Sequence, residues 1–539
     1  MTDDHDVVVV GAGFAGLYMV HSLRRIGLDV CGLERADGVG GTWWWNRYPG
    51  ARCDVESIEY SYSFDAELQQ EWVWTERYAS QPEILAYLEH VAERFGLLDA
   101  FRFGQTVIDA RWHEGTGRWH VVTDRGLTVT GKYLVMATGS LSSTNVPDIP
   151  GLDDFEGRVL HTGRWPAEPV DLHGHRVGVI GTGSSGIQVI PQIAEQADHV
   201  VVFQRTPNFS IPARNRPLPP EELAAIKAEY EEVRQRNREM QVAFGARAER
   251  ETVSVLSVPP DQARARLERA WEAGGLPFLM TYPDLGLDPA ANDLAADFVK
   301  DKIRQVVSDP HVADRLLPEQ MIGCKRLCAD TGYYETFNHS HVHLVDLRDD
   351  PIERVTPTGV ATTSAAFDLD VLVLATGFDA MTGSLLAIDP VGRDGRRLAE
   401  AWSAGPVTYL GLGVPGFPNM FVVAGPGSPS VLTNMVVSIE QHVEWISDCI
   451  EHCERGGVDT IEAEPDDAAR WVDYVNTLAG LTLFPTCNSW YLGANVPGKP
   501  RVFMPVPGFP GYAAQCDHVA ASGYAGFRLG RRRDATIAS

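Results

Sequence analysis

The sequence is poor in cysteine and shows no cysteine-rich framework. Its 539 residues include eight cysteines, which are widely spaced, at positions 31, 53, 324, 328, 449, 453, 487 and 516. This spacing excludes a disulfide-stabilised scaffold and favours reduced thiols in the cytosol. Cys449, His452 and Cys453 share one face of a predicted helix, but no second pair of ligands accompanies them. We therefore interpret them as buried thiols and expect no metal site.

Long apolar runs and an excess of basic residues are also missing. The longest apolar run, Val7–Val20, contains three glycines and is too short to cross a bilayer, so we expect no membrane association. Lys and Arg total 46 against 72 Asp and Glu, which gives a formal net charge of −26 and argues against a nucleic-acid partner. The acidic N-terminus does not resemble a signal peptide. These features predict a cytoplasmic protein, either a monomer or a weak homo-oligomer.

What the sequence does contain is a nucleotide-binding pattern at its start. Val7–Val10 form a continuous apolar stretch, which is typical of a parallel strand buried on both faces. Three glycines follow in the motif GAGFAG, namely Gly11, Gly13 and Gly16. They permit a tight turn and close approach of a pyrophosphate before a helix predicted at residues 15–25. A second strand ends at Glu34, whose carboxylate can accept hydrogen bonds from ribose hydroxyls, so this pattern predicts FAD or NAD.

The same pattern recurs near residue 180 with one difference. The motif GTGSSG supplies Gly181, Gly183 and Gly186, and the next strand ends in Gln204, Arg205 and Thr206 instead of an acid. A carboxylate at that point would repel a 2′-phosphate, whereas Arg205 would attract it. The second pattern therefore predicts an NADP site.

Two further apolar strands, at 132–140 and 369–379, each contain Ala-Thr-Gly at the end. We interpret these ends as the places where the chain crosses between nested domains. The predicted fold class is α/β, with two nested Rossmann-like dinucleotide-binding domains and a helical insertion that carries no assignable motif. The predicted boundaries are an FAD domain of residues 1–140 and 380–539, an NADP domain of residues 141–214 and 325–379, and the helical insertion of residues 215–324.

A histidine-bearing segment lies between the two glycine motifs. FEGRVLHTGRWP fits the pattern F-x-G-x-x-x-H-x-x-x-W-P through Phe155, Gly157, His161, Trp165 and Pro166. Flanked by GAGFAG and GTGSSG, it resembles the fingerprint of type I Baeyer–Villiger monooxygenases, in the branch of the phenylacetone and steroid monooxygenases. The likeness covers almost the whole chain and includes GGTWWWNRYPGARCDVESIEYSYSF, QRTPNFSIPARN, CKRL, GPGSPSVLTNM and SWYLGANVPGKPRVFM. In that family the fingerprint belongs to the interdomain connection, so we expect His161 to pack against both domains.

The resemblance implies a flavoprotein that uses FAD, NADPH and O2 to convert a ketone into an ester or a lactone. In that family NADPH reduces FAD, the reduced flavin adds O2 at C4a, and the resulting peroxide attacks a ketone to give a tetrahedral (Criegee) adduct. The cofactors supply the difficult chemistry, while the protein orients the reactants and stabilises charge. Aryl, cyclic, linear and steroid ketones all stay open as substrates.

Arg326, in the motif CKRL, matches the catalytic arginine of the family. Its guanidinium is always charged, so it would stabilise both the peroxide anion and the alkoxide of the adduct. Asp54 matches the acid near that arginine and the flavin, and it would balance and orient the guanidinium. Lys325 matches a residue that contacts the NADP phosphate. Consecutive residues of an extended segment point in opposite directions, so Lys325 and Arg326 can serve different ligands.

The motifs and the resemblance together give two sets of expected cofactor contacts. For FAD they are Gly11, Gly13, Phe14, Ala15, Gly16, Glu34, Gly41, Thr42, Trp43, Asp54, Tyr60, Val107 and Met435. For NADP they are Arg52, Gly181, Thr182, Gly183, Ser184, Ser185, Gly186, Gln188, Arg205, Thr206, Lys325, Arg326 and Trp490. Ser430 and Val431 are expected to border the substrate pocket, because GPGSPSVLTNM resembles a lengthened loop of the same branch.

Three other functions share parts of this pattern. A flavoprotein disulfide reductase also nests two nucleotide domains, but it needs a redox CxxC, whereas Cys324 and Cys328 form CxxxC around Arg326. A heteroatom-oxygenating or N-hydroxylating flavin monooxygenase (sulfoxidation, amine hydroxylation) shares both glycine motifs and is the principal alternative. A non-catalytic NADP-sensing protein would keep both sites without ketone-dependent turnover.

Overall fold

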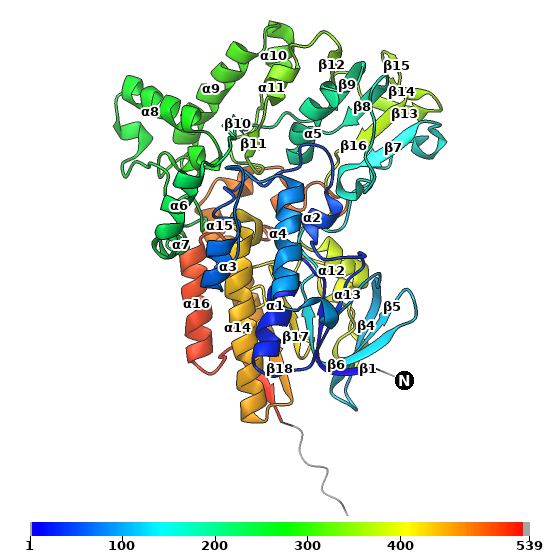
Figure 1. Cartoon of the computed structure of the whole chain (residues 1–539), viewed down its shortest axis with the longest axis vertical. Coiled ribbons are helices and arrows are strands. Elements are labelled where there is room, and N and C mark those ends of the chain that lie inside the picture. Colours follow the sequence, from blue (N-terminus) through cyan, green and yellow to red (C-terminus); the bar gives the residue numbers. More distant parts are fainter. Residues whose placement is uncertain (1–2, 532–539) are drawn as a thin grey trace, which may run out of the picture.

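The first glycine motif follows the central strand of a seven-stranded sheet. The structure is a computed structural model that describes residues 3–531, and Figure 1 shows the whole chain. Four parallel strands run in the order β3 (Phe101–Arg102), β2 (Val30–Leu33), β1 (Asp3–Val10) and β6 (Thr128–Met136). Two antiparallel strands continue the sheet, β5 (Arg118–Thr123) and β4 (Val107–His113). The valines at the end of β1 are buried, as the apolar pattern predicts.

The seventh strand brings the C-terminal part of the chain into this N-terminal sheet. β17 (Met420–Val422) pairs in parallel with β6. Helix α14 (Met435–Gly456) then packs against α1 (Phe14–Arg25), and Figure 1 shows the two side by side, in gold and blue. The Tyr18 hydroxyl of α1 donates to the Glu444 carboxylate of α14 over 3.2 Å. Segments about 300 residues or more apart in the sequence therefore build the same sheet and its helical cover.

The second glycine motif follows a strand of a five-stranded sheet that is parallel throughout. Its order is β12 (Val342–Asp346), β9 (His199–Gln204), β8 (Arg176–Ile180), β16 (Val371–Leu374) and β7 (Arg158–His161). Helix α5 (Ser184–Ala194) connects β8 to β9 and packs on both. An antiparallel sheet of β13 (Ile352–Thr356), β14 (Gly359–Thr362) and β15 (Ala366–Asp368) precedes β16.

The insertion between β10 (Ser210–Pro212) and β11 (Cys328–Asp330) is helical, as predicted. Its helices are α6 (Pro220–Ala228), α7 (Tyr230–Arg238), α8 (Pro260–Ala273), α9 (Pro289–Val306) and α10 (Pro310–Leu316). The run EELAAIKAEYEEVRQRNREM is not one continuous helix, because the backbone at Glu229 leaves helical geometry with φ −109° and ψ 14°. Figure 1 shows α8, α9 and α10 (green) at the opposite end of the molecule from the first sheet.

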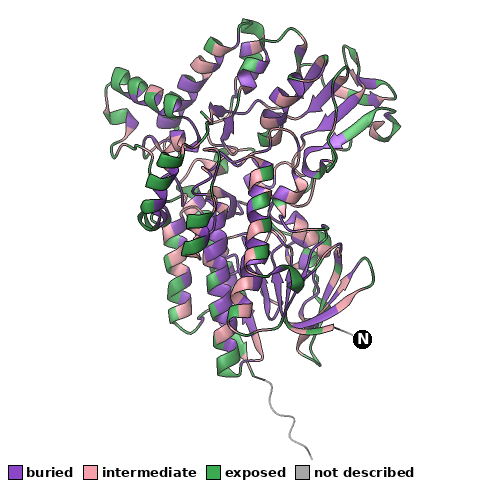
Figure 2. Ribbon diagram, viewed as in Figure 1, coloured by how far each residue is buried: buried purple, intermediate pink, exposed green. Residues whose placement is uncertain are grey.

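The remaining elements complete the layers around the two sheets. The helices are α2 (Thr42–Trp45), α3 (Ala66–Glu71), α4 (Gln81–Arg94), α11 (Tyr333–Thr336), α12 (Gly383–Ile388), α13 (Leu398–Ala401), α15 (Pro465–Gly480) and α16 (Phe509–Ala521). A two-stranded antiparallel sheet joins β18 (Thr460–Ala463) to β19 (Phe527–Gly530). Figure 2 shows the strands of both sheets as mostly buried, whereas the helices of the insertion present broad exposed faces.

The predicted fold class is confirmed by these two mainly parallel sheets, each with a glycine turn after a central strand. The boundaries at 140, 214, 324 and 379 stay predictions. Among residues 3–531, no helix combines the length and apolar composition needed to cross a bilayer. The sequence also predicts a disordered tail after Leu529; Gly530 instead ends β19, and the residues from 532 on lie outside the described residues.

Candidate active site

The first glycine turn has the shape that a pyrophosphate needs. Gly11 has φ +111°, and a Cβ on Gly16 would lie 1.8 Å from the carbonyl oxygen of Gly11. Helix α1 begins at Phe14, and Ala15 is its second residue. Its N-cap, Gly13, offers no side-chain hydrogen bond. The first N–H groups of the helix therefore lack an intrahelical partner and carry the positive end of its dipole. This turn fits the diphosphate of a dinucleotide.

Glu34 sits beside this turn, as the spacing predicts. Its carboxylate accepts the N–H of Ala12 over 2.7 Å and the N–H of Ala36 over 2.8 Å. Burial raises the pKa of Glu34, although the two backbone donors act in the opposite direction. Each carboxylate oxygen keeps a second lone pair. Ribose hydroxyls can therefore donate to Glu34 without displacing the bonds that hold it.

The segment after the first turn brings aromatic side chains to the same place. A Cβ on Gly13 would lie 3.3 Å from the Cα of Gly41, so the N-terminus of α2 lies directly against the glycine turn. Trp43 is buried, and its indole N–H donates to the Tyr60 hydroxyl over 3.3 Å. Thr42 opens α2. The remaining expected FAD contacts, Val107 and Met435, lie at the start of β4 and of α14.

The second glycine turn repeats the first. Gly181 also has φ +111°, and a Cβ on Gly186 would lie 2.2 Å from the carbonyl oxygen of Gly181. Helix α5 begins at Ser184, and Ser185 is its second residue. Its N-cap, Gly183, again gives no side-chain hydrogen bond. No atom lies within 4 Å of where a Cβ on Gly183 would stand, so open space faces this turn. The second turn can therefore hold a second diphosphate.

Two cations, Arg205 and Lys325, lie close enough for the charge of one to affect the other. Arg205 is exposed and follows β9, while Thr206 accepts a hydrogen bond from the Thr182 hydroxyl over 3.1 Å. Burial lowers the pKa of Lys325, and the nearby Arg205 charge lowers it further. Two like charges held close together repel each other, and an anion between them would relieve that repulsion. This arrangement suits a phosphate group.

Arg326 is held by a two-point ion pair. Its Nε donates to Asp54 Oδ2 over 2.8 Å and its Nη2 donates to Asp54 Oδ1 over 2.7 Å. The third donor, Nη1, binds the carbonyl oxygen of Val431 over 2.9 Å. The pKa of Arg326 is raised because the Asp54 carboxylate more than offsets the opposing effect of burial. Asp54 follows α2 and Arg326 precedes β11, so the pair joins segments 272 residues apart.

The backbone around Arg326 differs from the extended segment that the sequence suggests. Residues 322–325 form turns and a bend, and the extended strand β11 begins only at Cys328. Arg326 nevertheless faces Asp54 while Lys325 lies near Arg205, so the two side chains do serve different surroundings. The side chains of Lys325 and Arg326 point to different places because of this turn, and not because the residues of a strand alternate between two faces.

Two more segments that the sequence assigns to the site approach Arg326. Ser430 and Val431 lie in the short turn η7 (Ser430–Leu432), and both are buried. Trp490 opens the turn η9 (Trp490–Leu492), and its ring packs 4.4 Å from the ring of Tyr491. Tyr491 is buried, and the charge of Arg326 lowers its pKa against the larger effect of burial, so this turn also lies near the guanidinium.

Gln188 and Arg52 bind each other across the two domains. The Gln188 amide donates to the carbonyl oxygen of Arg52 over 3.1 Å and accepts the Tyr48 hydroxyl over 2.8 Å. The Arg52 guanidinium donates to Glu76 and to the carbonyl oxygen of Tyr78, each over 2.7 Å. Both expected NADP contacts therefore already have protein partners at the domain boundary.

His161 ties the two interdomain crossings together. Its Nε2 lies 3.3 Å from the carbonyl oxygen of Asn145, in the first crossing, and 3.3 Å from the Thr376 hydroxyl, in the second. Its Nδ1 accepts the N–H of Gly163 over 2.9 Å. Because Nδ1 accepts, the proton of the neutral ring lies on Nε2. Burial lowers the pKa of His161, which keeps the ring uncharged.

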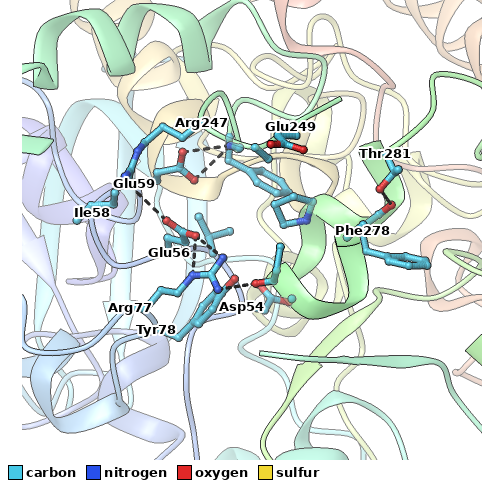
Figure 3. A pocket seen from close by; sticks show the side chains of 18 of the residues that line it. Asp54, Glu56, Ile58, Glu59, Arg77, Tyr78, Arg247, Glu249, Phe278 and Thr281 are labelled. Carbon is cyan, nitrogen blue, oxygen red and sulfur yellow. Dashed lines mark hydrogen bonds and ion pairs between the residues drawn. The ribbon is translucent and has the colours of Figure 1, made fainter. Parts of the chain in front are cut away.

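A cavity of about 400 Å³ lies between the first domain and the insertion and reaches Asp54. Residues 54–59 and 77–78 form one wall, and residues 216–281 supply the other (Figure 3). Glu56 pairs with Arg77 over 2.7 Å and with Arg247 over 3.9 Å. Phe244 and Phe278 add aromatic surface.

The second wall of this cavity could not be predicted from the sequence. Its residues lie in a stretch without a recognisable motif, and the four aromatic residues of this stretch do not distinguish a pocket wall from a buried helical core. Among residues 3–531 there is also no group of three or more side chains placed to hold a metal ion.

Comparison with known proteins places this geometry in context. Residues 4–215 match the flavin-binding monooxygenase-like family. A protein of Pseudooceanicola batsensis named Baeyer-Villiger monooxygenase is 45% identical over 505 residues, 93% of this chain and 92% of that protein. Phenazine N-monooxygenase PhzNO1 of Lysobacter antibioticus is 41% identical and covers 97% of each chain.

Solved structures agree with the sequence relatives. An oxidised steroid monooxygenase bound to NADP superposes with a TM-score of 0.93 at 53% identity, over 98% of this chain and 100% of that one. A structure described as OTEMO in complex with FAD and NADP gives a TM-score of 0.94 at 40% identity, over 98% of this chain and 100% of that one.

Proposed function

This chain belongs to the flavin-dependent Baeyer–Villiger monooxygenases, and from that premise we propose that it inserts one oxygen atom beside the carbonyl of a ketone. The product is an ester or a lactone, and the second oxygen atom of O2 leaves as water. The observation that carries this proposal is the Arg326 guanidinium, fixed by Asp54 and Val431.

The cofactors are FAD and NADPH, and the residues present fit both. The first turn with Glu34 would hold FAD, and the second turn with Arg205 and Lys325 would hold NADPH. When bound, the flavin accepts hydride from NADPH and activates O2. The uncapped N-termini of α1 and α5 would bind the two diphosphates. Open space at Gly183 leaves room for the second cofactor.

Arg326 would stabilise negative charge on oxygen during the reaction. A guanidinium keeps its charge at any pH that the protein survives, so it serves both the incoming oxygen donor and the carbonyl oxygen of the ketone. The bidentate contact with Asp54 fixes the plane of the guanidinium. One N–H on Nη1 and one on Nη2 are not used by these contacts and can donate to a substrate. Asp54 is thus a positioning residue in this proposal.

We propose that the ketone reaches Arg326 from the cavity beside Asp54. The cavity volume of about 400 Å³ lies in the range of small-molecule sites. Phe244 and Phe278 would contact the apolar part of the ketone, and Ser430, Val431 and Trp490 would border the far side.

Replacing Arg326 with Ala tests the function. Ester or lactone formation from a panel of aryl, cyclic, linear and steroid ketones should fall by about 10²–10³, because one charge-stabilising donor set is lost. NADPH should still bleach the yellow flavin, since the nucleotide turns are untouched. Arg125→Ala, at an exposed loop, is the matched control and should behave like the parent. Equal product formation by Arg326→Ala and the parent would refute the proposal.

Oxygenation of an aromatic nitrogen is the second candidate, favoured by the 41% identity to a phenazine N-monooxygenase. Oxygen transfer to a ring nitrogen forms no carbonyl alkoxide, so Arg326→Ala should affect this reaction less than the ketone reaction. Incubating the parent and Arg326→Ala with NADPH and either phenazine or ketones separates the two functions.

We further propose that the protein works in the cytoplasm as a monomer or weak homo-oligomer. All eight cysteines carry free thiols, which suits a reducing compartment. Sedimentation of the purified protein across a concentration series measures its assembly state.

A further inference from the structure

The thiol of Cys328 reaches the second glycine turn and has no part in the reaction described so far. Cys328 opens β11, two residues after Arg326, and is buried. β11 packs against α5, and the Cys328 thiol donates to the hydroxyl of Ser184, the first residue of that helix, over 3.2 Å. The strand that follows Arg326 is therefore tied to the start of α5, where the NADPH diphosphate would bind.

The hydroxyl of Ser184 has the Cys328 thiol as its one hydrogen-bond partner in the described part of the chain. Ser184 is exposed, and no atom lies within 4 Å of a Cβ placed on the neighbouring Gly183. A serine oxygen that accepts a proton from a thiol keeps its own O–H for another acceptor. The thiol thus leaves the Ser184 O–H available to donate into the open space at the turn.

The sulfur of Cys328 is itself held in place. The Asn208 amide donates to this sulfur over 3.7 Å and to the carbonyl oxygen of Arg326 over 3.4 Å. Asn208 is buried, and its backbone carbonyl oxygen accepts the Tyr334 hydroxyl over 3.1 Å. The carbonyl oxygen of Arg326 also lies 3.5 Å from the sulfur, but it already has the Asn208 donor. The single thiol proton therefore goes to Ser184, which is the shorter contact.

Burial keeps the thiol protonated. It raises the pKa of Cys328 to about 12, while the hydrogen bond with Ser184 acts in the opposite direction. At neutral pH the side chain is therefore a donor and not a thiolate. An ionised sulfur could only accept, and the Ser184 O–H would then turn toward the sulfur and away from the open space.

We propose that Cys328 is a positioning residue for NADPH: its thiol fixes the Ser184 hydroxyl so that the O–H donates to the cofactor diphosphate. This inference rests on the proposed placement of NADPH at the second turn. A phosphate oxygen is charged, so its hydrogen bond from Ser184 is of the stronger kind, and a hydroxyl that is already oriented costs less to order on binding. The Asn208 amide holds both the sulfur and the backbone of Arg326, so the same buried side chains fix the cofactor turn and the arginine relative to each other.

Calorimetric titration of NADP+ into the purified FAD-loaded protein tests this inference without turnover. Ser184→Ala should raise the Kd about tenfold and Cys328→Ala about threefold, because the first loses the hydrogen bond to phosphate and the second loses only its orientation. The double variant should match Ser184→Ala, since the thiol acts through that hydroxyl alone. Cys328→Ser keeps a donor and should bind NADP+ like the parent.

Matched variants decide the outcome. Cys516→Ala, in α16, removes a thiol that is equally buried but lies outside the second turn, and its Kd should equal that of the parent. If Cys328→Ala does not retain FAD, Cys328→Val takes its place, because valine fills the site without supplying a donor. An unchanged Kd in these Cys328 variants, an additive double variant or a Cys328→Ser protein that binds no better than Cys328→Ala would overturn the inference alone. An unchanged Kd in Ser184→Ala would overturn it together with the placement of NADPH at this turn.

Discussion

Two imidazoles, His161 and His442, are buried, and each uses one ring nitrogen as an acceptor and the other as a donor. Nδ1 of His442 accepts the N–H of Ala424 over 3.0 Å. Its Nε2 meets the Tyr512 hydroxyl over 2.9 Å, and that hydroxyl donates to the carbonyl oxygen of Leu410. Both nitrogens of each ring are thus satisfied only when the ring is neutral.

His442 makes the stability of the protein sensitive to acid. Burial lowers its pKa to about 3, while in the unfolded chain the imidazole takes up a proton near pH 6.5. Between these values the unfolded state binds more protons. The contribution of the neutral His442 ring to the free energy of unfolding is therefore complete above pH 6.5. Below that pH it falls by at most about 1.4 kcal/mol per pH unit.

His442→Gln keeps one donor and one acceptor but cannot titrate. The free energy of unfolding, measured with urea, should fall less steeply between pH 6.5 and 4 in this variant than in the parent. Glu59, whose pKa burial raises to about 7, gives an opposite slope that is common to both proteins and cancels in the comparison. Parallel pH profiles for the two proteins would show that His442 does not carry this effect.

At the scale of elements, the two glycine turns combine identical backbone geometry with different surroundings. Gly13 is crowded by Gly41, whereas no atom lies within 4 Å of a Cβ placed on Gly183. At Gly13, an added methyl group would meet the protein's own backbone at Gly41. The open space at Gly183 is the space that we assign to NADPH, so a methyl group there would meet the cofactor rather than the fold.

Gly183→Ala should fold and retain FAD while the KM for NADPH rises on the order of tenfold, which corresponds to about 1.4 kcal/mol of lost binding. Gly286→Ala is the control, because it also meets no atom within 4 Å and lies outside both turns. Steady-state titration with NADPH measures the change. An unchanged KM in Gly183→Ala would place the cofactor elsewhere.

The elements around both turns could be predicted because their signals are local. Valine runs, glycine spacing and the acid at Glu34 identified β1 and α1 to within a few residues, and the second glycine motif does follow a strand, β8. The break at Glu229 could not be predicted, since no glycine or proline marks it. The cavity wall at 216–281 depends on tertiary packing between segments far apart, which no periodic pattern records.

At the scale of the whole molecule, few hydrogen bonds join the helix of the second glycine turn to the first domain. The Gln188 amide links α5 to Tyr48 and Arg52, and His161 links the two crossings. Because these bonds are buried or partly buried, their loss leaves polar groups unpaired at the boundary.

A double-mutant cycle with Tyr48→Phe and Gln188→Ala measures the strength of this boundary. Each single variant should lower the free energy of unfolding. The double variant should lower it by less than the sum, with a coupling energy of about 0.5–1.5 kcal/mol, because both changes remove the same hydrogen bond. Strict additivity in chemical denaturation would contradict this reading.

The pairing of β17 with β6 also affects the order in which the two sheets can form while the protein is being synthesised. A ribosome that has passed residue 374 has already made every strand of the second sheet, so that sheet can form early. The first sheet, begun at residue 3, waits for β17 and then for α14 to cover α1. The sheet that contains the first strand of the chain is therefore completed after the second sheet.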